Sequence, residues 1–177
     1  MPKIFKTQDG FTLIETIAIL VILGILVAIV VSRLTNYNMD VYTGVDALKA
    51  HLRYAQTMAM NKDPNTDANT ETMMGINYDA GANQYWLFKG IDTTNILLLP
   101  DDSKYITGDR KIDLAAKNIR LDSGFTIYFD NHGIPYTAYT TSTMNTPLAN
   151  DLTINVISLS SGFSKPLKIT QRTGFIP

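Results

Sequence analysis

The chain has 177 residues, a formal net charge of −1 and no cysteine. This length allows one domain with a hydrophobic core, alone or with a membrane anchor. The lack of cysteine excludes disulfide bonds, thiolate nucleophiles and cysteine-based metal sites, and the near-neutral charge disfavours a strong nucleic-acid partner.

The N-terminus combines a short polar segment with a long apolar one. Residues 1–10 hold two lysines and one acid, and an unbroken apolar run extends from Ile17 to Val31. The stretch from Phe11 to Val31 has about the ~20 residues that a helix needs to cross the hydrocarbon of a bilayer. Basic residues before it and few directly after it predict a cytoplasmic leader, with the bulk of the chain outside.

Three simpler interpretations of this segment compete. A secretory signal would have a small-residue cleavage site after its apolar core, and no convincing site of that kind is present. A plain signal anchor fits better but leaves Glu15 unexplained. A buried core helix would need apolar partners that the rest of the chain does not supply.

Glu15 is the most informative residue of the segment. A carboxylate at the centre of a spanning helix costs roughly 2.5–3.5 kcal/mol, and less near its end. If the chain is cut after Gly10, the new amino group of Phe11 is a cation about one helical turn away. The two groups pair poorly within one chain. They can pair well between neighbouring chains offset along an axis, and the pairing would then set the register.

The residues Gly10-Phe11-Thr12-Leu13-Ile14-Glu15, followed by an apolar helix, resemble the prepilin leader of type IV pilins and type II secretion pseudopilins. The resemblance covers residues 8–31. It implies that a membrane-bound prepilin peptidase cuts between Gly10 and Phe11 and methylates the new N-terminus. It also implies that Glu15 contacts the N-terminus of an adjacent subunit. Many members carry a helix-kinking proline where this chain has Ser32, so the kink does not carry over.

Beyond Arg33 the sequence predicts that the helix continues to about Lys62, since Pro64 disfavours helical geometry at Asp63. Gly44 weakens this helix and could allow a bend. If the helix is continuous from Phe11, its length would be about 75–80 Å. Its apolar stripe comprises Tyr37, Val41, Val45, Leu48, Leu52, Ala55 and Ala59. Its predicted solvated face comprises Asp46, Lys49, Arg53 and Gln56.

From Met73 onward, short apolar runs and turn residues predict an antiparallel sheet, which gives an α+β, pilin-like fold with the sheet packed on the second half of the helix. Asp130-Asn131-His132-Gly133 predicts a hairpin turn. The expected strands are Met73–Tyr78, Gln84–Lys89, Ile96–Leu99, Ile119–Leu121, Phe125–Phe129, Pro135–Thr140, Leu152–Leu159 and Pro166–Thr170.

This head also resembles one subgroup, the minor pseudopilins and minor pilins related to the type II secretion tip protein GspH and the pilin FimT. The residues that carry this weaker resemblance are Leu48 to Gln56, Phe129-Asp130…Gly133 and Ile169-Thr170…Thr173-Gly174.

Other constellations are weaker. The alternating oxygen ligands from Asp63 to Glu71 lack the glycine and glutamate of a calcium loop, so we expect a flexible polar loop. His51 and His132 have no zinc-type grouping, although a Ser-His-Asp triad stays open. Trp86 is expected in a strand core. Lys165, Lys168 and Arg172 form a mild basic cluster in a region where FimT-like DNA-uptake pilins use basic residues. Phosphate binding needs several such charges, so in this near-neutral chain we expect a solvated strand face rather than a nucleic-acid site.

The predicted domains are a leader at residues 1–10, a transmembrane and filament-core helix at 11–32, an amphipathic continuation at 33–63 and a periplasmic β-rich head at 64–177. The resemblance implies a minor pilin or pseudopilin. It would be a non-enzymatic subunit of a type IV pilus or type II secretion pseudopilus, without a cofactor.

The implied partners are a prepilin peptidase, other pilin or pseudopilin subunits, an inner-membrane assembly platform and membrane lipid. The implied location is the bacterial inner membrane in a single pass, with the head in the periplasm, and then the filament. Two alternatives stay open: a head that binds DNA or a secreted substrate, and a signal-anchored periplasmic enzyme.

Overall fold

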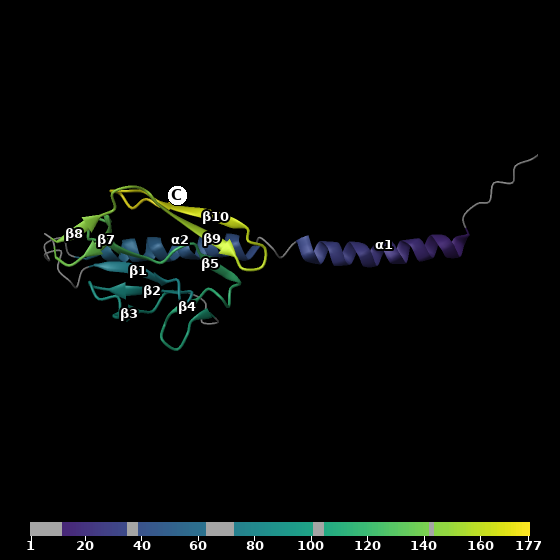
Figure 1. The fold of residues 1–177 in the computed structure, drawn as a ribbon, viewed down its shortest axis with the longest axis horizontal. Coiled ribbons are helices and arrows are strands. Elements are labelled where there is room, and N and C mark those ends of the chain that lie inside the picture. The colour runs from purple at the N-terminus through teal and green to yellow at the C-terminus, as the bar shows by residue number, and fades with distance from the viewer. Residues whose placement is uncertain (1–11, 35–38, 63–72, 101–104, 142–143) are drawn as a thin grey trace, which may run out of the picture. The chain divides into compact units, whose positions relative to one another are not determined.

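The computed structural model describes residues 12–34, 39–62, 73–100, 105–141 and 144–177. The chain divides into two compact units, Met1–Asn36 and Tyr37–Pro177. Within the described residues, the first unit contains the helix α1 (Leu13–Leu34). The second, called the head below, contains the helix α2 (Met39–Met60) and ten strands (Figure 1). The α+β prediction is confirmed.

Helix α1 is apolar on all sides and helical through Ser32. Its side chains from Leu13 to Val31 are exposed in the isolated chain. These 19 residues form a helix about 28 Å long, close to the hydrocarbon thickness of a bilayer. The predicted continuation of this helix into the next one passes through residues 35–38, which lie outside the described residues.

Helix α2 is amphipathic. The predicted stripe from Val41 to Ala59 is buried throughout and faces the sheets, while Tyr37 lies outside the described residues. The helix runs without a break through Gly44, which is buried. A Cβ at Gly44 would stand 2.3 Å from Ile119 Cδ1, so this glycine admits close packing of β5 against the helix.

The larger sheet follows the order β3-β2-β1-β6-β7-β8, with β4 also paired to β2, and its named pairs are antiparallel. Its strands are β1 (Met74–Asp79), β2 (Gln84–Lys89), β3 (Ile96–Leu97), β4 (Ile112–Asp113), β6 (Phe125–Phe129), β7 (Pro135–Tyr139) and β8 (Asn145–Pro147). The smaller antiparallel sheet has the order β10-β9-β5 and consists of β5 (Ile119–Leu121), β9 (Leu152–Ser158) and β10 (Ser164–Ile169).

Residue alternation in the central strands creates two cores. Ile76, Leu87 and Phe129 point toward α2 and join the main core, which both sheets share. Trp86 and Phe88 point to the opposite face of the larger sheet and form a second cluster with Met73, Tyr128 and Tyr139. The prediction that Trp86 is strand core is confirmed, and its indole N–H donates to the carbonyl of Thr93 at 2.7 Å.

The predicted hairpin turn after Phe129 is present. The N–H of Gly133 donates to the carbonyl of Asp130 at 2.9 Å, and Gly133 has a φ of 76°. The buried carboxylate of Asp130 accepts from the N–H groups of His132 and Ile134 and from the Tyr136 hydroxyl. Asp130 therefore stabilises the turn through its side chain.

Candidate functional site

The first candidate site is the N-terminal processing and assembly segment. Gly10 and Phe11 lie outside the described residues. Glu15 lies in the first turn of α1 and is exposed. Its N–H donates to Thr12 Oγ1 at 3.3 Å, which makes Thr12 the N-cap of the helix.

The position of Glu15 lowers its electrostatic cost. The N-terminal turn of a helix carries partial positive charge on its free N–H groups, which favours a carboxylate there. The Thr-x-x-Glu spacing of Thr12 and Glu15 is a helix-start signature that the sequence analysis did not use. The segment therefore combines a defined helix start, an acid beside it and an apolar surface without a partner inside the described chain.

The second candidate site is the basic cluster of the head, and two of its three cations already have partners. Lys165 and Lys168 both lie in β10. Lys168 Nζ forms an ion pair with Asp151 at 2.7 Å, and Lys165 Nζ lies 4.2 Å from the centre of the Tyr42 ring. Arg172 follows the strand in a turn, with a φ of 66°.

A groove of about 460 Å³ lies between α2 and β10. Lys49, Lys165 and Lys168 line it, but so does Asp46, and Asp151 holds Lys168. The charges around the groove therefore nearly cancel. This balance does not favour phosphate binding, which needs several unpaired cations on one surface.

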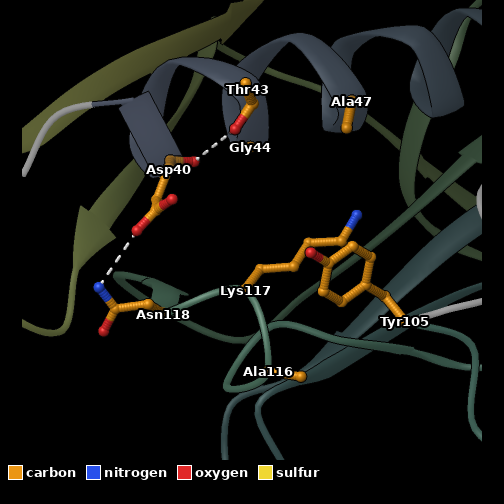
Figure 2. Close-up of a pocket in the computed structure, with 8 residues that line it drawn as sticks. All are labelled: Asp40, Thr43, Gly44, Ala47, Tyr105, Ala116, Lys117 and Asn118. Carbon is orange, nitrogen blue, oxygen red and sulfur yellow. Dashed lines mark hydrogen bonds between the residues drawn. The ribbon is translucent and has the colours of Figure 1, made fainter. Parts of the chain in front are cut away.

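A second cavity, of about 440 Å³, lies between the start of α2 and the segment around β5 (Figure 2). Asn118 donates to the Asp40 carboxylate at 3.3 Å, and Thr43 Oγ1 lies within hydrogen-bond reach of the Asp40 carbonyl at 3.1 Å. The Lys117 ammonium lies 4.7 Å from the centre of the Tyr105 ring. Its lining thus offers polar groups but no nucleophile paired with a base.

The two histidines occupy different environments. His51 is buried, 4% exposed, and its Nδ1 lies 2.8 Å from the hydroxyl of Tyr85 in the main core. His132 Nδ1 lies 3.9 Å from the Asp130 carboxylate, which already accepts hydrogen bonds within the turn. These contacts are to a tyrosine and to a turn aspartate, so they give no support to the Ser-His-Asp triad that the sequence left open. The segment from Asp63 to Glu71, predicted to be a polar loop, lies outside the described residues.

Sequence reasoning missed a polar clamp at the C-terminal segment. Arg53 is exposed, as predicted, but Gln56 is half-buried. Gln56 Nε2 instead donates to the carbonyls of Gly133 at 2.9 Å and Thr173 at 3.1 Å. Arg53 donates to the carbonyl of Ile176 at 2.6 Å. A Cβ at Gly174 would stand 2.6 Å from Gln56 Nε2 and 2.7 Å from the Gly133 carbonyl oxygen.

The clamp joins three segments that the sequence analysis singled out separately: the end of α2, the β6–β7 turn and the Thr173-Gly174 pair. This contact explains the residue types of the three segments. The Gln56 amide supplies both donors, and Gly133 and Gly174 leave space for that amide. The clamp thus holds the end of this cysteine-free chain without a disulfide.

The comparisons with known proteins concern the first site. No curated protein and no solved structure matches the chain. A family model described as the prokaryotic N-terminal methylation motif matches residues 5–31, which include Gly10, Phe11 and Glu15. This motif implies processing by a prepilin peptidase and assembly with other pilins, and it points to a structural subunit. The chain therefore carries the N-terminal signal of type IV pilins and pseudopilins.

Proposed function

We propose that this protein is a minor pilin or pseudopilin of the GspH- and FimT-like subgroup, an assembly subunit of a type IV pilus or a type II secretion pseudopilus. The observation that carries the proposal is the methylation motif at residues 5–31, with Glu15 at the start of an exposed apolar helix. The head, with its own core on α2, is the part that would face the periplasm.

In this proposal the precursor sits in the inner membrane through residues 11–32, and the peptidase cuts between Gly10 and Phe11. Methylation leaves the new amino group of Phe11 cationic. Glu15 of an incoming subunit then pairs with the N-terminus of its neighbour, and α1 exchanges lipid for the helices of other subunits. Head-to-tail contacts of this kind do not close, so they build an open filament with the help of an inner-membrane platform.

The test compares two neutralised acids in the native host. Glu15→Gln should still be cleaved and held in the membrane but should be lost from the assembled fraction, by at least about tenfold if the pairing contributes ~1.4 kcal/mol or more. Asp46→Asn, the same chemical change on an exposed position of α2, should assemble normally. Normal assembly of Glu15→Gln would contradict the proposed role of Glu15.

The two alternative functions gain little from the head. Neutralising Lys165, Lys168 and Arg172 together would abolish DNA retention if the head were a nucleic-acid module, but Lys168 already has an acidic partner. An enzyme would need a nucleophile activated by a base, whereas the Asp40 carboxylate in one cavity accepts from an amide and Lys168 in the other is paired with a carboxylate. Neither alternative is therefore proposed here.

A further inference from the structure

The head exposes a group of large apolar side chains where α2 begins. Met39 and Tyr42 lie on the first turn of α2, and Leu159 and Phe163 lie in the turn between β9 and β10. The two aromatic rings are 6.0 Å apart between centroids. We call these four residues the entry patch. In Figure 1 the β9–β10 turn and the start of α2 lie at the same end of the head.

The exposed fractions of the four side chains range from 36% to 62%, so the entry patch belongs to neither core. Its backbone is held in place, because the N–H of Leu159 donates to the Asn118 carbonyl and the N–H of Ser158 to the Phe163 carbonyl. At the edge of the patch the Lys165 ammonium lies over the Tyr42 ring at 4.2 Å. A fixed, exposed apolar patch of this kind normally marks a contact surface.

The chain itself indicates which surface the patch meets. Only residues 35–38 separate Leu34, the last residue of α1, from Met39. Five Cα–Cα steps span at most about 18 Å, so covalent geometry keeps Met39 of the entry patch within that distance of Leu34. If α1 crosses a bilayer, this end of α1 lies at the boundary between hydrocarbon and headgroups.

The composition of the patch also fits that boundary. Tyrosine gains from the headgroup layer, where its apolar ring is buried and its hydroxyl stays wet, and phenylalanine adds apolar surface toward the acyl chains. A lysine beside them can keep its ammonium in the headgroup region while its stem contacts apolar surface. We propose that the entry patch inserts into the lipid interface while the subunit waits in the membrane before assembly.

The inference rests on the proposed function, because it requires α1 to span the membrane. It adds that the head has a lipid-contacting end. Leaving the bilayer for a filament would expose this patch again, so extraction would have to overcome the binding of the head as well as that of α1.

The absence of native cysteine permits single-cysteine reporters in the full chain. Leu159→Cys reports on the patch, and Met144→Cys is the matched control, since Met144 is 67% exposed and precedes β8 at the other end of the head. Leu20→Cys reports on α1. Each cysteine is labelled with an environment-sensitive fluorophore. Each labelled variant is inserted, one copy per disc, into nanodiscs of phosphatidylcholine and phosphatidylglycerol. The discs also contain a lipid that carries a nitroxide quencher near its headgroup. Fluorescence of Trp86, the single tryptophan, verifies that each head is folded.

The nitroxide lipid should quench the Leu159 label at least about twofold more than the Met144 label, and soluble iodide should show the opposite preference. Adding Phe163→Ser should weaken lipid quenching at Leu159, whereas adding Leu98→Ser should not. Equal quenching at Leu159 and Met144, with a Leu20 label that soluble iodide does not reach, would overturn the lipid contact and leave the anchor intact. A Leu20 label that iodide quenches would overturn both. Protection of Leu159 from iodide only in vesicles crowded with protein would assign the patch to a second copy and would also overturn the inference.

Discussion

The two helices of this chain have the same length, 22 residues, but opposite relations to the rest of the molecule. Helix α1 is apolar all round and buries none of its residues between Leu13 and Val31 within the described chain. Helix α2 is amphipathic and buries one stripe against two sheets. The difference shows that one helix stabilises the head, whereas the other has its apolar surface available for lipid or for other subunits.

The largest expected effect comes from truncating the same residue type in each helix. Leu52→Ala removes a fully buried side chain and should lower the free energy of unfolding of the head by about 2–5 kcal/mol. Leu20→Ala in α1 should leave it unchanged, because Leu20 is exposed. Denaturant titration in detergent, followed by Trp86 fluorescence, measures both. Equal losses would mean that α1 contributes to the fold of the head.

A pair of helical glycines gives a second contrast. Gly44→Val should destabilise the head by about 1–3 kcal/mol, because the added atoms collide with Ile119. Gly24→Val in α1 meets nothing within 4 Å and should have no effect on the head. The same titration tests the pair. A neutral Gly44→Val would show that Ile119 can move aside and that the close packing on α2 is not required.

The clamp should give a smaller loss. Gln56→Leu removes the donors to Gly133 and Thr173, which should cost about 1–2 kcal/mol of head stability. Gln171→Leu is the matched control, since Gln171 is exposed in the turn after β10. Hydrogen exchange of the C-terminal segment should accelerate in the first variant only. Unchanged exchange there would contradict the role of Gln56.

The smallest expected effect is a loss of head stability at alkaline pH that leaves helix α1 unchanged. Burial and then the nearby Asp130 carboxylate raise the pKa of Tyr136 to about 12, above the value of about 10 in an unfolded chain. The contribution of Tyr136 is therefore complete below about pH 10 and disappears as the pH rises toward 12.

Burial also raises the pKa of Tyr78, Tyr128 and Tyr139, so the head should lose further stability as the pH rises above about 10. Helix α1 contains no tyrosine and should keep its helicity by far-ultraviolet circular dichroism. In Tyr136→Phe the fall in unfolding free energy between pH 10 and 12 should be shallower than in the wild type. Parallel slopes would show that Tyr136 titrates alike in the folded and unfolded states.

Periodicity was sufficient to predict much of the architecture. The α2 stripe and most strands show the 3.6 or 2.0 spacing that burial on one face imposes. The short strands β4 and β8 were missed, because two or three residues such as Ile112-Asp113 and Asn145–Pro147 carry no readable alternation.

The polar contacts of the head were harder to predict. Gln56 lies off the apolar stripe and looks solvated in sequence, yet it bonds Thr173, 117 positions later. Helical spacing does not predict which distant segment of the chain packs against the polar face of a helix. The sequence placed His51 on the helix but did not predict its buried contact with Tyr85. That contact also requires β2 to take its place in the larger sheet. The N-terminal site was predictable from sequence because its motif is contiguous.

The most direct test of the central claim is the intact mass of the mature protein isolated from its own host. The mass should lack Met1 to Gly10 and include one added methyl group, as expected of a prepilin-peptidase substrate whose new N-terminus can pair with Glu15. A mass that still includes residues 1–10 would leave only a signal-anchored protein and would contradict the filament function.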